Sequence, residues 1–283
     1  RWTPRSMVRY DRGMMTEAVL ALSTSGALGG AAVAVAALMV GTWLVSLVLR
    51  NASIVDITWG LGFVVVAWVS ALRADAASGA ASVLVAMVTV WGLRLGVYLF
   101  WRNHGNGEDY RYVAMRRRWG KRFWLISLAT VFVLQGALMW IVSLPVQVAH
   151  VGDARDGALA GVALVIGLAL YAIGLLFEVV GDAQLARFKA DPTNEGKVMR
   201  SGLWRYTRHP NYFGDACVWW GVGIVAQAVT GTWWALLGPL VMNILLLRVS
   251  GVALLERSLR KRKPDYAEYV RTTSAFVPRP PRQ

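Results

Sequence analysis

The stretch 202–215, with the sequence GLWRYTRHPNYFGD, concentrates arginines, an imidazole, aromatic rings and two short polar side chains just before an apolar run. Arginine offers forked donors that suit phosphate oxygens, and Asn211 and Asp215 can hold amide or ribose hydroxyl groups. On a helix these two residues, at i and i+4, share one face. The alternative is that these basic and aromatic residues contact anionic lipid at the membrane surface, a role that does not need Asn211 or Asp215. The stretch predicts a site for an anionic, partly aromatic ligand.

Four charged residues stand inside apolar stretches, namely Asp56, Arg94, Glu178 and Arg248. A charge within a bilayer costs about 2.5–3.5 kcal/mol on insertion scales, so each of these side chains needs a partner. Each is therefore a candidate site residue. The alternative is a structural role, either in ion pairs between helices or, for Glu178 and Arg248 near the ends of their stretches, by reaching toward the membrane surface.

The composition predicts a membrane protein. Of 283 residues, 56% are hydrophobic and 16% charged, whereas soluble domains carry about 25% charged residues. The mean hydropathy is +0.46, and the 14 Trp suit membrane interfaces. A soluble enzyme is not expected, and disorder and fibrous repeats are excluded. The single cysteine, Cys217, cannot form an intrachain disulfide, and no spacing predicts a metal site.

The net charge of +14 comes from 30 Lys and Arg that gather in polar stretches around 102–122, 187–208 and 257–271. Basic loops between apolar stretches indicate the positive-inside rule, and they predict no nucleic-acid partner. About seven spans are expected in an all-α helical bundle: Ala27–Leu49, Ile54–Leu72, Ala80–Trp101, Phe123–Leu144, Ala158–Val180, Tyr212–Val229 and Trp233–Leu255.

If the basic loops are cytoplasmic, the links 73–79, 145–157 and 230–232 and the N-terminus lie outside and the C-terminus inside. Arginines near the N-terminus conflict with this topology, and a start at Met14 or Met15 would remove the conflict. Residues 1–13 are accordingly expected to be a disordered upstream extension, and 14–283 a single domain. The longest polar stretch between spans, 181–210, predicts a functional segment with a short interfacial helix at 183–190.

Several motifs resemble the steroid 5α-reductase superfamily. They are 181–189 (GDAQLARFK) with 202–215, 51–60 (NASIVDITWG), 91–95 (WGLRL) and 107–112 (GEDYRY). The resemblance is strongest to the bacterial branch of uncharacterised membrane proteins with a 3-oxo-5-alpha-steroid 4-dehydrogenase-like C-terminal domain, and it covers most of the chain from Asn51 to Pro278. It implies a seven-helix bundle that takes NADPH from the cytosolic side and passes a hydride to the β-carbon of a conjugated, lipid-soluble enone. The expected location is the bacterial inner membrane, among membrane lipids.

The resemblance places the cofactor in the part 178–283. Motif positions imply cofactor contacts for Asp182, Lys189, Asn211 and Asp215, and more loosely for Lys197, while the tail with Tyr266 and Tyr269, preceded by Glu256, completes the pocket. From chemistry, Arg187, Arg205, Arg208 and His209 are added as cations for the phosphates, and Tyr206 and Tyr212 as aromatic neighbours.

At the substrate end, the family pairs an acid with a tyrosine to hydrogen-bond the enone carbonyl. Asp56 fits the acid, but Trp91 stands where the tyrosine belongs. Tyr98, at i+7 from Trp91, is the expected substitute, and Trp59, Trp91 and Arg94 are expected to line the substrate site. To donate a hydrogen bond Asp56 must be protonated, which burial favours and Arg94 opposes, so an Asp56–Arg94 ion pair is the alternative.

Two other functions stay open. A membrane methyltransferase of the isoprenylcysteine or phospholipid type also shows an Arg-His-Pro-x-Tyr motif before a late span, but S-adenosylmethionine carries no phosphate to use the many cations. A non-catalytic lipid-binding protein would need no cofactor. The acceptor of a reductase could be a sterol-like, polyprenyl or acyl lipid.

Overall fold

A computed structural model describes residues 4–74, 79–150, 157–249 and 251–282, and in these ranges every regular element is helical. The expected external links 73–79 and 145–157 fall partly at 75–78 and 151–156, and these positions, like residues 1–3, lie outside the described residues. The chain divides into two compact units. The first comprises residues 1–160 and 226–235, and the second comprises residues 161–225 and 236–283.

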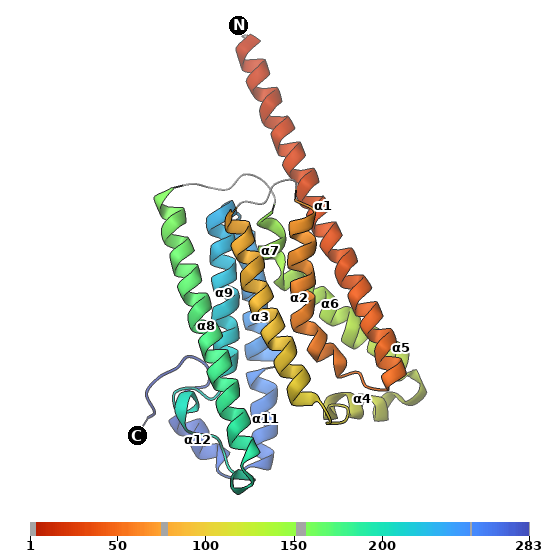
Figure 1. The fold of residues 1–283 in the computed structure, drawn as a ribbon, viewed down its shortest axis with the longest axis vertical. Coiled ribbons are helices and arrows are strands. Elements are labelled where there is room, and N and C mark those ends of the chain that lie inside the picture. The colour runs from red at the N-terminus through yellow and green to blue at the C-terminus, as the bar shows by residue number, and fades with distance from the viewer. Residues whose placement is uncertain (1–3, 75–78, 151–156, 250, 283) are drawn as a thin grey trace. The chain divides into compact units, whose positions relative to one another are not determined.

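Unit 1 begins with three long helices, α1 (Pro4–Leu49), α2 (Ile54–Leu72) and α3 (Gly79–Asn103). A polar loop leads to α4 (Tyr110–Trp119) and η1 (Gly120–Arg122), and then to α5 (Phe123–Ser127), η2 (Leu128–Val133), α6 (Leu134–Val142) and α7 (Leu144–Val148) (Figure 1). Helix α1 begins at Pro4, within the expected N-terminal extension 1–13.

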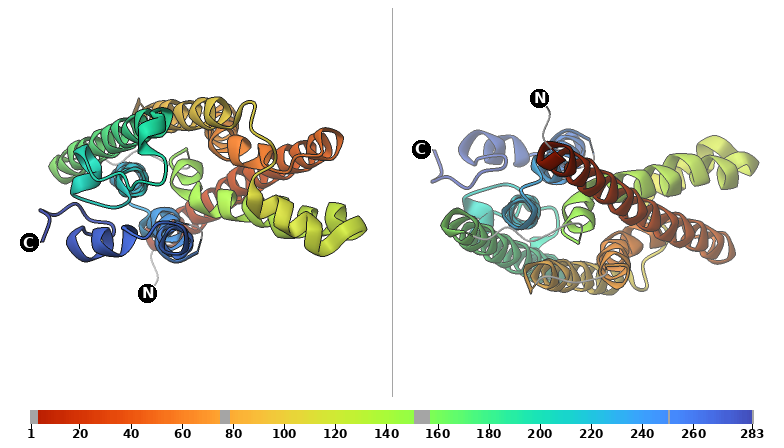
Figure 2. Two further views of the ribbon diagram at one scale, coloured as in Figure 1. Left: turned by 90° about the horizontal axis from the view of Figure 1, so that it is seen from below. Right: turned by 90° about the horizontal axis from the view of Figure 1, so that it is seen from above.

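Glycines allow α2 and α3 to pack closely, side by side (Figure 2). A Cβ built on Gly60 would lie 2.7 Å from the carbonyl oxygen of Gly92, and one on Gly92 would lie 2.5 Å from the carbonyl oxygen of Gly60. In a membrane, small residues let helix backbones approach because lipid provides no hydrophobic drive for association. This contact sets α2, which carries Asp56, against α3.

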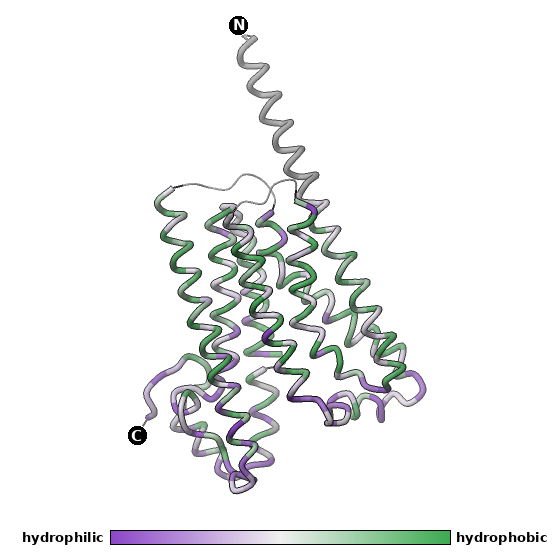
Figure 3. Tube along the Cα trace, in the orientation of Figure 1, coloured by the Kyte–Doolittle hydropathy of each residue, from purple (hydrophilic) through white to green (hydrophobic). Residues whose placement is uncertain are grey.

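Unit 2 contains nearly all of α8 (Ala158–Ala190), then η3 (Pro192–Asn194), η4 (Gly202–Arg205) and the first part of α9 (Pro210–Thr230). The chain passes through η5 (Trp233–Leu236) and continues as α10 (Leu237–Ile244), η6 (Leu245–Val249), α11 (Val252–Arg262) and α12 (Tyr266–Thr272). The apolar part of α8 and its polar C-terminal end are distinct in Figure 3.

Glycines also control the antiparallel packing of α8 on α9. A Cβ on Gly214 would lie 2.6 Å from the Gly174 carbonyl oxygen, and one on Gly221 would lie 2.6 Å from the Gly167 carbonyl oxygen. At the end of the contact, a Cβ on Gly181 would lie 3.2 Å from the Pro210 ring. The seven-residue spacing along both helices keeps these glycines on one face. It brings the C-terminal end of α8 to the first turn of α9.

Five helical stretches are long and apolar enough to cross a membrane, which confirms a membrane-type all-helical chain. They are Thr24–Leu49, Ile54–Leu72, Ala81–Asn103, Tyr110–Val142 and Ala158–Ala190, and Trp233–Val249 is a shorter apolar helical stretch.

Candidate functional site

The packing of α8 on α9 brings two predicted cofactor residues into contact in unit 2. The Nδ2 group of Asn211 donates to Oδ1 of Asp182 at 3.2 Å, and the Asp182 residue is 5% exposed. Asp215 lies on the same helix as Asn211, one turn later, as the spacing predicted. The three residues therefore form a polar group at the start of α9, close to the polar segment that precedes it.

The segment 202–209 is held against α8 by specific hydrogen bonds. The indole Nε1 of Trp204 donates to the Gly181 carbonyl at 3.1 Å, and the backbone N–H of Leu203 donates to Oε1 of Gln184 at 3.0 Å. The Tyr269 hydroxyl from α12 donates to the Trp204 carbonyl. These contacts anchor η4 beside the Asp182–Asn211 pair.

Arg208 and His209 are buried around the carboxylate of Glu256. Nε of Arg208 donates to Oε1 of Glu256 at 2.8 Å, and Nε2 of His209 lies 3.2 Å from the same oxygen. The other donors of Arg208 reach the carbonyls of Val270, at 3.1 Å, and Thr273. Arg208 and His209 are only 7% and 1% exposed. Arg208 was predicted as a phosphate ligand, but the structure commits its donors to internal acceptors.

Burial acts to raise the pKa of Glu256, but hydrogen bonds from His209 and Arg208 outweigh it and hold this pKa below its usual range. For Tyr266, burial is the main cause that raises the pKa to about 12. Burial likewise raises the pKa of Tyr269. At neutral pH Glu256 is therefore ionised and both tyrosines are neutral, as befits a buried structural cluster.

Five of the remaining predicted cofactor residues of this region lie on the surface. Arg187, Lys189, Lys197, Arg205 and Tyr206 are exposed, and the Tyr212 ring stacks on the His209 imidazole with centroids 5.4 Å apart and planes 10° apart. Surface cations beside the partly buried Asp182–Asn211 pair can meet an anionic ligand without the desolvation penalty of a buried charge.

In unit 1, Asp56 is the centre of a second polar group. Its Oδ2 accepts from the Arg111 guanidinium at 2.6 Å, and its Oδ1 accepts from the Tyr112 hydroxyl at 2.8 Å. Since both oxygens face donors, Asp56 has the surroundings of a carboxylate. The structure thus replaces the considered Asp56–Arg94 pair by a pair with Arg111, which comes from α4. Arg94 instead lies over the ring of Tyr98, 5.4 Å from its centroid.

The loop before α4 is tied to the start of α2 by further contacts. The backbone N–H of Ala52 donates to Oε1 of Glu108 at 2.8 Å, and the backbone N–H of Asp109 donates to Oγ of Ser53 at 2.6 Å. Arg116 pairs with Glu108 at 2.8 Å. The motifs 51–60 and 107–112, which were recognised from sequence without a role for the second one, are thus parts of one network. The sequence signal for this network was the run 107–112, which combines acidic, aromatic and basic residues shortly after an expected span.

Two acids in this network are tuned by their partners. Burial acts to raise the pKa of Glu108, but hydrogen bonds from Arg116 and the Ala52 N–H outweigh it and lower this pKa. Burial also acts to raise the pKa of Asp109, and hydrogen bonds from the Arg111 side chain and backbone outweigh it and lower this pKa. Both groups are ionised at neutral pH.

The predicted tryptophans of unit 1 form an aromatic cluster around Phe63. Its ring meets Trp59 edge-on at a centroid distance of 5.2 Å and Trp91 at 5.5 Å. Trp91 is fully buried. Trp91 therefore serves the core of the α2–α3 contact, and Trp59 joins it from the helix that carries Asp56.

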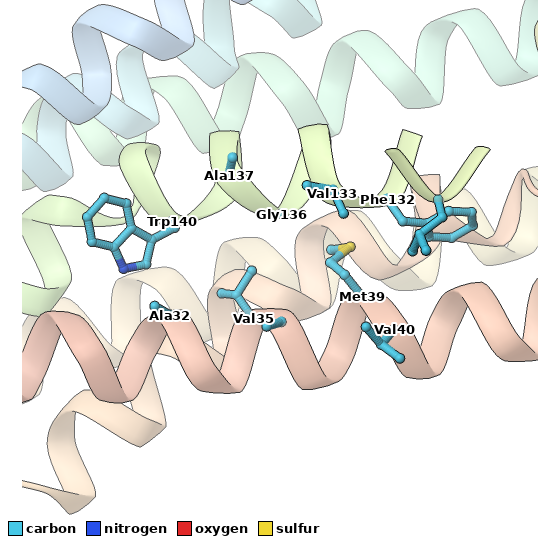
Figure 4. A pocket seen from close by; sticks show the side chains of 11 residues that line it. Ala32, Val35, Met39, Val40, Phe132, Val133, Gly136, Ala137 and Trp140 are labelled. Atoms are coloured by element: carbon cyan, nitrogen blue, oxygen red, sulfur yellow. The ribbon is translucent and has the colours of Figure 1, made fainter. Parts of the chain in front are cut away.

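Unit 1 also contains an apolar groove of about 300 Å³ between α1 and the η2–α6 stretch (Figure 4). Met39, Phe132 and Trp140 are among its lining residues, and the Trp140 indole N–H already donates to the Leu28 carbonyl. The lining suits a hydrocarbon chain, yet it presents no group for acid–base chemistry.

Comparison with known proteins places the chain in a family. No curated protein and no solved structure matches it. The family described as "Protein of unknown function (DUF1295)" matches residues 42–273, which include both polar groups described above. Because the match spans most of the sequence, the chain belongs to the DUF1295 family.

Proposed function

We propose that this protein is a membrane-embedded, NADPH-dependent reductase of the steroid 5α-reductase superfamily. Its substrate would be a lipid-soluble compound with a conjugated carbon–carbon double bond, of steroid-like, polyprenyl or acyl type. The observation that carries the proposal is the Asp182–Asn211 hydrogen bond at the α8–α9 contact. The two residues come from separate motifs of the resemblance, and they meet beside a segment rich in exposed cations.

The proposal includes seven membrane spans. Helix α9 and the apolar stretch Trp233–Val249 would be the sixth and seventh, in addition to the five long apolar helices. The segments rich in Lys and Arg would then face the cytoplasm of a bacterial inner membrane, in keeping with the positive-inside rule. The cofactor would enter from that side.

The residues of unit 2 fit a phosphorylated dinucleotide. Asp182 and Asn211 offer a carboxylate and an amide, which suit ribose hydroxyl or carboxamide groups. Arg187, Lys189 and Arg205 are exposed and offer positive charge for phosphate oxygens, whereas Arg208 is committed to Glu256. When bound, NADPH would supply the hydride for the β-carbon of the double bond.

In unit 1, the acid–tyrosine pair of this proposal is Asp56 with Tyr112 in place of Tyr98. The Tyr112 hydroxyl is 2.8 Å from Asp56, and Gln135 donates to the same hydroxyl at 3.5 Å. Asp56 orients the hydroxyl by accepting from it, and Arg111 pairs with the other oxygen of Asp56. The Tyr112 hydroxyl has one proton, which it donates to Asp56, so it would have to turn from Asp56 to donate to a substrate carbonyl.

Cofactor titration of the purified protein in lipid nanodiscs tests the proposal. NADPH should raise the unfolding temperature and NADH should do so less, because only NADPH carries the 2′-phosphate. Lys189→Ala should weaken NADPH binding about 3- to 10-fold and NADH binding much less, as expected for one exposed cation. Asn211→Ala should weaken both. Arg117→Ala, in unit 1, is the matched control and should change neither.

The outcome that contradicts the reductase is no response to either nucleotide. A response to S-adenosylmethionine alone would favour the methyltransferase. Lack of response to all three ligands, in a protein that unfolds cooperatively, would favour a non-catalytic lipid-binding protein. Equal losses of NADPH and NADH binding in Lys189→Ala would remove Lys189 from the phosphate role.

A further inference from the structure

Unit 2 contains a polar cavity that none of the predicted cofactor residues except Arg208 helps to form. Its volume is about 290 Å³, close to the lower end of the range of ligand pockets, about 300–1,000 Å³. Arg208 and the residues 270–275, 279, 280 and 282 line it. The lining residues thus come from the end of α12 and from the C-terminal tail, whose backbone is drawn in Figure 1.

The lining of this cavity is strongly basic. It includes Arg271, Arg279 and Arg282, all exposed, and no aspartate or glutamate. Within the described residues these three arginines form no ion pair with a carboxylate. The nearby Glu268 pairs instead with Arg200 at 3.0 Å. Arg208 is different, since Glu256 balances its charge. The positive charge of three side chains therefore remains available to a ligand.

The backbone of the tail is fixed by hydrogen bonds to the segment 206–208 and to Thr272. The Arg208 N–H donates to the Ser274 carbonyl at 2.9 Å, and the Arg279 N–H donates to the Tyr206 carbonyl at 2.9 Å. The Arg282 N–H donates to the Thr272 carbonyl at 2.8 Å. The prolines at 278, 280 and 281 restrict the tail further. A ligand would meet a backbone that is already ordered, which reduces the entropy cost of binding.

Neutral donors supplement the charges. Thr273 and Ser274 bring hydroxyl groups to the lining, whereas the Thr272 hydroxyl donates to the Glu268 carbonyl at 3.2 Å. The backbone N–H groups of Ser274 and Ala275 have no internal acceptor in the described part of the chain. Forked guanidinium donors, hydroxyl groups and amide N–H groups together match a tetrahedral oxyanion. A compact dianion uses such a lining better than a carboxylate does, because it has more oxygens and more charge.

We propose that the cavity binds the phosphate group of a phosphate monoester, carried either by a nucleotide or by a lipid headgroup. The site does not depend on the proposed reductase activity. If the source is the 2′-phosphate of NADPH, the tail arginines rather than the cations of 187–205 determine the preference for NADPH over NADH.

Inorganic phosphate is the first probe, titrated into the full chain in phosphatidylcholine nanodiscs at constant ionic strength. Wild-type protein should show saturable binding by calorimetry. The Arg279→Gln/Arg282→Gln variant should lose at least about tenfold in phosphate affinity, as expected for the loss of two charge-assisted contacts that are partly exposed to water. The control Arg117→Gln/Arg118→Gln removes the same charge from unit 1 and should stay within about twofold of wild type.

Equal losses in the two variants would overturn the proposal, because only net charge would then matter, and so would unchanged affinity in the tail variant. Unfolding temperatures without phosphate establish that both variants are folded. Single Arg279→Gln and Arg282→Gln variants provide the same comparison should the double variant be unstable.

Competition identifies the source of the phosphate. Displacement of phosphate by NADP⁺ but not by NAD⁺ would assign the cavity to a nucleotide, and displacement in nanodiscs that contain phosphatidic acid but not phosphatidylglycerol would assign it to a lipid monoester. Either result supports the site. A protein that binds phosphate through the tail arginines yet ignores NADPH would contradict the proposed reductase and leave this inference standing.

Discussion

The Asp56–Arg111 ion pair can be tested by a double-mutant cycle built from Asp56→Asn and Arg111→Gln. Asp56→Asn leaves an amide oxygen that can still accept from the Tyr112 hydroxyl. It removes the charged partner of Arg111, but Arg111 keeps a second one, because its Nε donates to Asp109 at 2.9 Å. The substitution therefore weakens the network without stranding a guanidinium.

The burial of the two side chains determines the expected size of the coupling. The Asp56 side chain is 17% exposed and the Arg111 side chain 39%, with 2.6 Å between Oδ2 and the guanidinium nitrogen. A hydrogen bond to a charged group contributes about 1.5–3 kcal/mol, while fully exposed ion pairs contribute about 0–1 kcal/mol. Because water screens Arg111 partly, we expect a coupling free energy of about 1–2 kcal/mol.

Equilibrium unfolding in mixed detergent and dodecyl sulfate micelles, followed by tryptophan fluorescence, gives the free energies of the four proteins. The control cycle pairs Asp56→Asn with Arg94→Gln. Arg94 is not among the partners of Asp56, so these effects should add within about 0.5 kcal/mol. An Asp56–Arg111 coupling below about 0.5 kcal/mol, or a larger one between Asp56 and Arg94, would refute this account of the network.

Two further predictions concern packing and pH. Gly214→Ala should destabilise the protein by about 1–3 kcal/mol, because its Cβ would lie 2.6 Å from the Gly174 carbonyl oxygen. Gly161→Ala, whose Cβ meets nothing within 4 Å, should instead stabilise α8 by up to about 1 kcal/mol. If both variants shift the unfolding temperature in the same direction, the close α8–α9 packing at Gly214 is contradicted. The folded-state pKa values of Glu108 and Glu256 are lowered, so the unfolded chain binds more protons and stability rises with pH. This contribution is complete above the ordinary value of 4.5 and is lost as pH falls through the lowered pKa, so the unfolding temperature should drop below pH 4.5, and less so in Arg116→Gln. An unfolding temperature that is constant from pH 5 to pH 3 would count against both ion pairs.

Hydropathy predicted the apolar helices well and their polar extensions poorly. The span Ile54–Leu72 agrees with α2 at both ends, whereas α8 continues from the expected end at Val180 to Ala190. The sequence indicated a separate interfacial helix at 183–190, but only Gly181 and Asp182 lie between it and the span, and α8 continues through both. A hydropathy profile reports where lipid is favourable, and backbone hydrogen bonding continues as long as the residues tolerate a helix.

Spacing along the chain could predict partners within one helix but not between elements. Asn211 and Asp215 needed only helical periodicity, and α9 provides it. An Asp56–Arg94 ion pair was the alternative considered from the sequence, yet the partner of Asp56 is Arg111, which a loop returns to the start of α2. Where two segments meet depends on tertiary contacts that hydropathy does not describe.

The same reasoning applies to the cations of unit 2. The sequence singled out Arg208 because it stands in a basic, polar motif, but the fold buries Arg208 against Glu256. Arg279 lies far from this motif in sequence, yet its backbone bonds to Tyr206 and it lines the same cavity as Arg208. Residue type identifies the side chains that can bind an anion. Which of these side chains still have free donors depends on the carboxylates and backbone carbonyls that the fold places beside them. The tail arginines are therefore a better place than Arg208 to look for a bound phosphate.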